Sequence, residues 1–304
     1  MGSGAVGGYF GAKLAVAGNE VIFIARGAHL KAMRNTGLRI VSPSGDLHIQ
    51  AASFAASPAE AASVDLVLFC VKSYDTETAG ATLGPLIGAQ TKILSLQNGV
   101  DNPAKLARLW GAERILAGVA YVGAQLDSPG LIRHSSGGKI IYGPLDGAIN
   151  APLNLIERTL STADIACAVS DHIYKVQWAK LLWNAPFCAI SCLARSNTQQ
   201  IVESKVLTQL SMDCMAEVRA AALLQGIELA PALFDETIAF SRSLGPFKPS
   251  MLQDLEAGKR LECDAFNGIV VRLLEQAGQP APINRVFNSL LQQINETLCE
   301  EAAR

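Results

Sequence analysis

The amino-terminal segment Gly2-Ser3-Gly4-Ala5-Val6-Gly7 is a G-x-G-x-x-G motif, a pattern that can bind a pyrophosphate. The first glycine of such a loop allows a tight turn, the second lets the backbone approach the phosphates, and the third lets the next helix pack closely. The free N–H groups and the positive dipole end of that helix then face the anion. These six residues therefore predict a dinucleotide-binding loop.

Three polar residues each follow a predicted strand. Arg26 stands roughly 20 residues past the glycines, where folds that use NAD place an Asp or Glu for the ribose 2′-OH. A guanidinium there suits a 2′-phosphate, which favours NADP(H), and Lys72 follows a neighbouring strand and can reach the same phosphate. Asn98 follows the next strand and can bridge the nicotinamide ribose or a substrate oxygen. The alternatives are solvated surface charges and, for Asn98-Gly99, an ordinary turn.

A second set of polar residues lies in a strongly apolar stretch of the carboxyl-terminal half. Lys180, Asn184 and Cys188 are spaced i, i+4 and i+8, so they share one helical face if the helix continues through Pro186. Desolvation would lower the pKa of such a lysine into the range of a general acid near neutral pH. A lysine that snorkels from the helix edge is the alternative.

Ser250 and Glu262 have sufficient structural explanations on local grounds. Ser250 is predicted to be the N-cap of a helix. Glu262 is predicted to start the following helix, where a carboxylate interacts favourably with the dipole. Taken alone, neither residue indicates a functional site.

The elements that must position these residues change character along the chain. Strands and helices alternate up to Val169, and only helical patterns follow from His172, which predicts domains at residues 1–171 and 172–304. The first is expected to be an α/β, Rossmann-type dinucleotide-binding sheet, the second all-α, with the ligand between them at the carboxyl ends of the strands. In the first domain, Gly137-Gly138 is expected to separate two short strands.

The first strand of this sheet is expected to be truncated. Tyr9 to Ala17 reads as the helix after the glycine loop and Glu20 to Ala25 as the next strand, but only Met1 precedes the loop. A doubly wound sheet has its central strand at that point. We therefore expect the native chain to extend upstream of Met1, and an in-frame stop codon immediately upstream would contradict this.

Composition excludes several classes of function. The 304 residues carry a net charge of −2 and have a sequence pI of about 6.1, which argues against a nucleic-acid partner. No apolar run approaches the roughly 18 residues of a membrane span and no signal peptide is seen, so we expect a cytoplasmic protein without a membrane partner. Seven cysteines without a CxxC pair predict free thiols, and the four histidines show no metal-ligand spacing, so no metal is expected.

In combination, the motifs resemble the ketopantoate reductase family over essentially the whole chain. The glycine loop is shared with many nucleotide-binding proteins, whereas three later segments are far more specific. The segments that carry the resemblance are Gly2 to Gly7, Ala25-Arg26-Gly27, Val71-Lys72, Gln97-Asn98-Gly99-Val100, Lys180-Leu181-Leu182-Trp183-Asn184, Ser250-Met251-Leu252-Gln253-Asp254 and Glu262-Cys263-Asp264-Ala265-Phe266-Asn267-Gly268.

This resemblance implies NADPH-dependent reduction of a 2-oxo acid to a 2-hydroxy acid. By resemblance, Lys180 corresponds to the proton donor, and Glu262 to the active-site carboxylate near the cofactor and the lysine. Asn98 corresponds to a residue that touches both the nicotinamide ribose and the substrate. Asn184 and Ser250 correspond to substrate-binding groups.

The resemblance also covers the phosphate-holding residues. Arg26 and Lys72 correspond to the phosphate-holding pair, in agreement with the NADP(H) prediction from residue types, and Ala124 is a candidate for a backbone contact with the cofactor. One departure concerns the substrate. Cys188 stands where many family members carry a second asparagine, so this chain lacks an amide for the hydroxyl of the substrate.

The leading hypothesis is a reductase of 2-dehydropantoate (ketopantoate) that serves pantothenate biosynthesis. A reductase of another branched 2-oxo acid is an alternative, and a non-catalytic NADP-binding regulator is a second. The expected partner is a small 2-oxo acid, and a homodimer is among the assemblies that we consider.

Overall fold

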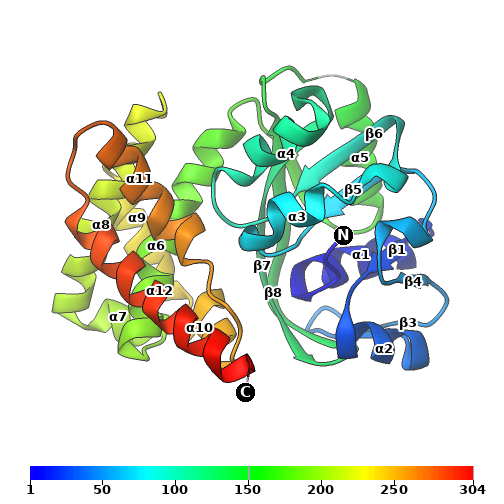
Figure 1. Ribbon diagram of the computed structural model, residues 1–304, viewed down its shortest axis with the longest axis horizontal. Coiled ribbons are helices and arrows are strands. Elements are labelled where there is room, and N and C mark those ends of the chain that lie inside the picture. Colours follow the sequence, from blue (N-terminus) through cyan, green and yellow to red (C-terminus); the bar gives the residue numbers. More distant parts are fainter. Residues whose placement is uncertain (150, 304) are drawn as a thin grey trace. The chain divides into compact units, whose positions relative to one another are not determined.

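The computed structural model describes residues 1–149 and 151–303, which divide into two compact units (Figure 1). The first, Met1–Asn98 with Asn102–Ile173, is an α/β unit. The second, Gly99–Asp101 with Tyr174–Arg304, is helical. The helical unit therefore includes a three-residue segment from the first half of the sequence, which we call the tongue, Gly99–Asp101.

The α/β unit contains a seven-stranded sheet and a separate pair of strands. The sheet has the order β3-β2-β8-β7-β6-β5, with β9 also paired to β8, and the separate pair is β1 with β4. Strands β5, β6 and β7 are parallel, whereas β7 and β8 are antiparallel. The strands are β1 (Ile22–Ile24), β2 (Leu38–Val41), β3 (Leu47–Ile49), β4 (Ser53–Ala55), β5 (Val64–Phe69), β6 (Ile87–Ser95), β7 (Ile115–Ser128), β8 (Leu131–Pro144) and β9 (Ala166–Val169).

The first three residues join the two groups of strands. The amino group of Met1 donates to Leu68 O of β5 at 2.8 Å, and burial lowers the pKa of this amino group. On the other side, the backbone N–H groups of Gly2 and Ser3 donate to Ile24 O of β1 at 3.1 and 3.0 Å. The start of the glycine loop is therefore held by backbone bonds to strands on both sides.

Five α-helices accompany the strands in the described part of this unit. They are α1 (Ala5–Val16), α2 (Gly27–Thr36), α3 (Thr76–Gly80), α4 (Asn102–Trp110) and α5 (Ala151–Thr162). Helix α1 packs through its glycines, because a Cβ on Gly8 would overlap the Ile132 side chain and one on Gly11 would lie 2.7 Å from the Phe23 ring. This close approach positions the amino end of α1 against the strands.

The prediction that Gly137-Gly138 separates two short strands is wrong. Strand β8 is continuous from Leu131 to Pro144, and both glycines lie within it at positive φ values of 75° and 117°. The register passes from the Tyr121–Lys139 pair to the Val122–Gly137 pair, so Gly138 is an extra, unpaired residue in β8. The two glycines therefore mark an irregularity inside one long antiparallel ladder, which glycine in a strand commonly does.

The helical unit is built around α6. Its elements are α6 (Ile173–Ala194), α7 (Thr198–Glu203), α8 (Lys205–Leu224), α9 (Leu233–Ser243), α10 (Ser250–Glu256), a π-helical turn (Asp264–Gly268), α11 (Ile269–Gln276) and α12 (Pro282–Ala303). Leu181, Leu182 and Phe187 of α6 are buried in the same apolar cluster as Val100 of the tongue. No helix among the described residues is long and apolar enough to cross a membrane.

Candidate active site

The glycine loop leaves open space over the amino end of α1. Gly2 has φ +83°, and a Cβ there would lie 2.8 Å from Val71 N, while one on Gly7 would lie 2.5 Å from Gly2 O. In contrast, no heavy atom of the described residues lies within 4 Å of a Cβ built on Gly4. Gly4 is the N-cap of α1, and no side chain in the described part of the chain caps the helix or places an acid in its first turn. This uncapped, open helix end fits a pyrophosphate.

Arg26 and Lys72 lie on adjacent loops. Arg26 precedes α2, and its 81% exposed side chain places Nη2 3.0 Å from Oδ2 of Asp75. Asp75 belongs to the 3₁₀ turn that follows Lys72. The backbone N–H of Asp75 donates to Lys72 O at 2.9 Å. The Arg26–Asp75 pair thus brings together the two loops that the sequence predicts to hold a 2′-phosphate.

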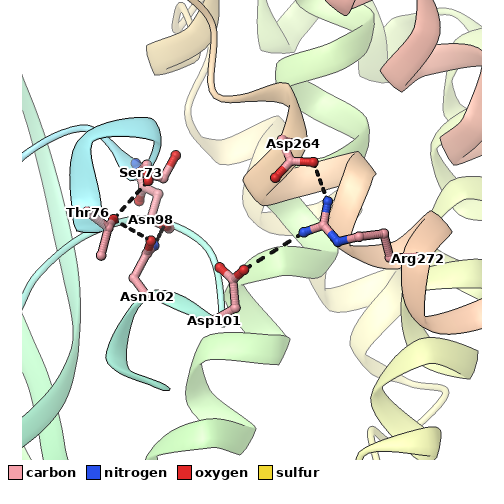
Figure 2. Close-up of polar contacts among 7 residues, drawn as sticks. All are labelled: Ser73, Thr76, Asn98, Asp101, Asn102, Asp264 and Arg272. Atoms are coloured by element: carbon pink, nitrogen blue, oxygen red, sulfur yellow. Dashed lines mark hydrogen bonds and ion pairs between the residues drawn. The ribbon is translucent and has the colours of Figure 1, made fainter. Parts of the chain in front are cut away.

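Asn98 lies where the chain leaves the α/β unit. Its carbonyl oxygen accepts a hydrogen bond from Nδ2 of Asn102 at 2.7 Å (Figure 2). The tongue follows directly: Val100 is buried in the helical unit, and Asp101 lies 3.8 Å from Arg272. Asn98 is therefore held through its backbone oxygen by Asn102, the residue that follows the tongue.

Ala124 differs from the other predicted cofactor residues because it lies within a strand. It belongs to β7, is half-buried, and has His134 of β8 as its register partner. Its backbone is thus part of the β7–β8 ladder rather than of a loop.

Helix α6 presents Lys180, Asn184 and Cys188 on one face. The helix runs continuously through Pro186, as the predicted shared face requires. Burial lowers the pKa of Lys180 to about 8, and the nearby charges of Cys188 and Glu262 oppose part of this shift. Asn184 is 4% exposed and Cys188 is fully buried. A lysine with this pKa is largely protonated at pH 7 and can still release its proton, as a general acid must.

Neighbouring residues of α6 fix the rotation of the helix. The rings of Trp183 and Phe187 are stacked with centroids 5.5 Å apart, and Trp183 Nε1 donates to Ser241 Oγ of α9 at 3.0 Å. In addition, Nδ2 of Asn267 donates to Ala185 O at 3.1 Å. These contacts hold the Lys180 and Asn184 positions in a defined orientation.

The residue that precedes Glu262 is held by a side chain far along the chain. Oδ1 of Asn295 accepts from Leu261 N at 2.7 Å, and its Nδ2 donates to Leu261 O at 3.1 Å. Glu262 itself is 4% exposed and directly precedes the helical stretch that begins at Cys263 and continues through the π-helical turn. The predicted place at a helix start is confirmed, and the carboxylate also lies close enough to Lys180 to affect its pKa.

The predicted capping role of Ser250 is wrong. The N-cap of α10 is Pro249, and Ser250 is the first residue of the helix. No side chain of the described residues makes a cap hydrogen bond at this helix start. The half-buried hydroxyl of Ser250 is therefore left without the structural role that the sequence predicts for it.

The predicted residues fall into two groups, one in each unit. The α/β unit holds the glycine loop, Arg26, Lys72 and Asn98, and the helical unit brings Lys180 close to Glu262 on a scaffold that includes Asn184. Apart from Asn267, which lies in a segment that carries the resemblance, the residues that hold these groups in place were not predicted, and most of their partners are distant along the chain. They are Asp75, Thr76, Asn102, Asn267 and Asn295. Within the described residues, no cluster of three or more His, Cys, Asp or Glu residues offers a metal site.

Two family models match this chain. "Ketopantoate reductase PanE/ApbA" matches residues 1–147, and "Ketopantoate reductase PanE/ApbA C terminal" matches residues 172–295. The chain belongs to the ketopantoate reductase family. The predicted family, the oxidoreductase activity and NADP(H) as its cofactor are thereby confirmed.

Relatives and solved structures agree over nearly the full length. A 2-dehydropantoate 2-reductase of Mesorhizobium japonicum is 32% identical, with 93% of this chain and 92% of the relative covered. The crystal structure of a PanE/ApbA family ketopantoate reductase from Ralstonia eutropha is 34% identical with a TM-score of 0.89, covering 98% of both chains. A 2-dehydropantoate 2-reductase from Geobacter metallireducens is 32% identical with a TM-score of 0.91, covering 96% of this chain and 98% of that one. The predicted fold class is confirmed.

Proposed function

We propose that this protein reduces a 2-oxo acid to a 2-hydroxy acid with NADPH, and that the substrate is 2-dehydropantoate, which yields pantoate for pantothenate biosynthesis. The observation that carries the proposal is the lysine of α6. Lys180 has its pKa lowered to about 8, lies within electrostatic range of Glu262, and shares a helix face with Asn184. Curated relatives named 2-dehydropantoate 2-reductase support the substrate.

The residues of the α/β unit hold the cofactor in this proposal. The uncapped amino end of α1 and the open space at Gly4 take the pyrophosphate, and Arg26 and Lys72 take the 2′-phosphate. Asn98 contacts the nicotinamide ribose and the substrate, and Ala124 contributes a backbone contact. Bound NADPH supplies the hydride that adds to the 2-carbon of the substrate.

Lys180 completes the reduction by donating a proton to the carbonyl oxygen. Negative charge develops on this oxygen as the 2-carbon is reduced, and an ammonium group stabilises the charge before it transfers the proton. Glu262 supports the charged form of Lys180, because its carboxylate raises the lysine pKa against the effect of burial. Asn184 and Ser250 bind the substrate, and the hydroxyl of Ser250 is available because it does not cap α10.

Cys188 makes a different branched 2-oxo acid the second candidate substrate. Its fully buried thiol is on the Lys180 face of α6 and is a weaker hydrogen-bonding group than an amide. A substrate with an apolar tail is better matched to a thiol than one with a hydroxyl. A substrate panel that includes both kinds of 2-oxo acid separates the two candidates.

A non-catalytic NADP-binding regulator is the alternative from another functional class. A sensor requires the phosphate-binding loop but has no use for a lysine of lowered pKa beside a buried carboxylate. The decisive assay follows NADPH oxidation with ketopantoate and a panel of branched 2-oxo acids. Turnover with at least one acid supports the proposal, and tight NADPH binding without turnover on any of them supports the regulator.

The proposed cellular location is the cytoplasm. All seven cysteines are free thiols, four of them buried, as proteins of a reducing compartment commonly show. Fractionation of cells followed by immunodetection tests this location, and recovery of the protein outside the cytoplasmic fraction would contradict it.

A further inference from the structure

We propose that Thr76 is a positioning residue whose buried hydroxyl couples the Lys72 loop to Asn98. The inference rests on the proposed function, because it assigns Thr76 an effect on both cofactor binding and substrate reduction. Thr76 is the first residue of α3 and is 1% exposed. It lies four residues after Lys72 along the chain, and Figure 2 shows it beside Asn102 and Asn98.

The hydroxyl of Thr76 is surrounded by three hydrogen-bonding partners. Nε2 of Gln97 donates to Oγ1 at 2.7 Å, so one lone pair of the hydroxyl is used. The single hydroxyl proton is shared between two acceptors, Ser73 O and Oδ1 of Asn102, each at 2.8 Å. Thr76 thus connects the turn that follows Lys72 with the residues next to Asn98.

Each amide in this network has only one satisfactory orientation. Asn102 donates through Nδ2 to Asn98 O at 2.7 Å, which directs its Oδ1 toward Thr76. Gln97 accepts from Ser95 Oγ through Oε1 at 3.1 Å, which directs its Nε2 toward Thr76. Thr76 must therefore accept from one amide and donate to the other. Among uncharged side chains of this size, only a hydroxyl does both well.

Burial makes the network sensitive to loss of this hydroxyl. Asn102 is fully buried, and Gln97 and Ser95 are 6% and 1% exposed. Valine has nearly the shape of threonine but has no hydrogen-bonding group, so it leaves Oδ1 of Asn102 and Nε2 of Gln97 without this partner. Asn102 then loses the contact that fixes its amide, and the bond to Asn98 O is no longer held in place.

The test compares Thr76→Val with Thr76→Ser in the full-length protein. We expect Thr76→Val to lower kcat/KM with NADPH and the 2-oxo acid by about 10-fold or more, and Thr76→Ser to restore it to within about 3-fold of wild type. Thr82→Val is the matched control, because the exposed Thr82 hydroxyl donates only to Ala79 O within its own turn. Wild-type kinetics for Thr76→Val, or no rescue by serine, would overturn the proposal.

A double-mutant cycle with Asn98→Ala separates positioning from general destabilisation. If Thr76 acts through Asn98, the loss caused by Thr76→Val shrinks to less than about 2-fold in the Asn98→Ala background, because interacting residues are non-additive. An equal loss in both backgrounds would overturn the proposal. If Thr76→Val does not fold, Thr76→Ala takes its place, since alanine also lacks a hydrogen-bonding group, and wild-type kinetics for it would count against the proposal.

The same double-mutant cycle is repeated with the Kd of NADPH as the measured quantity. Fluorescence gives this Kd and needs no turnover. A protein that binds NADPH but reduces no 2-oxo acid contradicts the proposed function alone. Additive effects of Thr76→Val and Asn98→Ala on the Kd contradict the role of Thr76 alone.

Discussion

The guanidinium of Arg26 lies 3.0 Å from the carboxylate of Asp75, so the cation predicted to bind the 2′-phosphate already has an anionic neighbour. The Arg26 side chain is 81% exposed and that of Asp75 is 32% exposed, and exposed pairs contribute only about 0–1 kcal/mol to stability. The significance of the pair is therefore electrostatic. Asp75 orients Arg26 and, at the same time, repels a phosphate that approaches it.

Removing this carboxylate should strengthen the preference for NADPH. In Asp75→Asn we expect the ratio of kcat/KM for NADPH to that for NADH to rise by about 3- to 10-fold, because the negative charge next to the phosphate is lost. Steady-state kinetics with both cofactors at low and high salt measure the ratio. Arg26→Asp is the opposing control and should erase the preference, whereas a lower ratio in Asp75→Asn would contradict the prediction.

The activity should depend on the protonation of Lys180. Because the pKa of Lys180 is about 8, we expect kcat/KM for reduction to be constant below this pH and to fall tenfold per pH unit above it. Lys180→Ala should lower kcat by about 10²–10⁴-fold and remove the decline above pH 8. NADPH affinity should change by less than about 3-fold, and an equally large loss of cofactor binding would disprove the assigned role.

Lys180 should lower the free energy of unfolding near neutral pH. Its pKa is lowered in the folded protein, so the unfolded chain binds more protons between about pH 8 and 10.5, and stability rises across that window. Lys180→Met removes the half-buried, desolvated charge and should therefore be more stable than wild type at pH 7 by about 1 kcal/mol or more. Urea unfolding at pH 7 and at pH 10 checks this, since the advantage of methionine must shrink at the higher pH.

Position 188 should set the preference for a hydroxylated substrate. We expect Cys188→Asn to raise kcat/KM for ketopantoate relative to 3,3-dimethyl-2-oxobutanoate, which lacks the hydroxyl, by about 5- to 50-fold, because the amide adds a donor and an acceptor. Parallel assays with the two acids give the ratio. Cys192→Ser, a change at another buried cysteine of α6, is the control and should leave the ratio unchanged.

The start of α12 offers a prediction about stability. Oε1 of Glu217 accepts from Ile283 N at 2.8 Å, and Oε2 accepts from Asn284 N at 2.9 Å and Asn284 Nδ2 at 2.7 Å. Glu217→Gln should lower the free energy of unfolding by about 2 kcal/mol, because charge-assisted bonds to a helix start are weakened and one amide hydrogen faces a donor. Asp213→Asn, which changes an exposed contact with Gln209, should cost less than about 0.5 kcal/mol.

Local patterns were enough to predict the alternation of strands and helices and the face of α6, because hydrophobic periodicity depends on neighbouring residues. They failed where a distant partner decides the outcome. The Gly137-Gly138 pair stays within β8 because the ladder with β7 continues past Gly138, which forms a bulge there. Ser250 shows that a helix boundary predicted from sequence can be wrong by one residue, since the N-cap of α10 is Pro249 and not the serine.

The residues of the candidate site could be identified from the sequence, but how they come together in space could not. The shared face of Lys180 and Asn184 follows from helical spacing alone. The lowered pKa depends on how completely the lysine is buried, and the proximity of Glu262 depends on the course of the chain after α10. Asp75 carries no motif of its own, and only the fold of the loop after β5 brings it to Arg26.

The tongue means that the helical unit is not a contiguous module of the sequence. A chimera that exchanged residues 174–304 with those of a relative would keep the resident Gly99–Asp101, and with it a Val100 that is 6% exposed in a core of foreign side chains. Mismatched core volumes cost roughly 1–3 kcal/mol by overpacking or by leaving a cavity. Recombination of whole domains in this family would therefore be constrained by three residues that lie outside the exchanged segment.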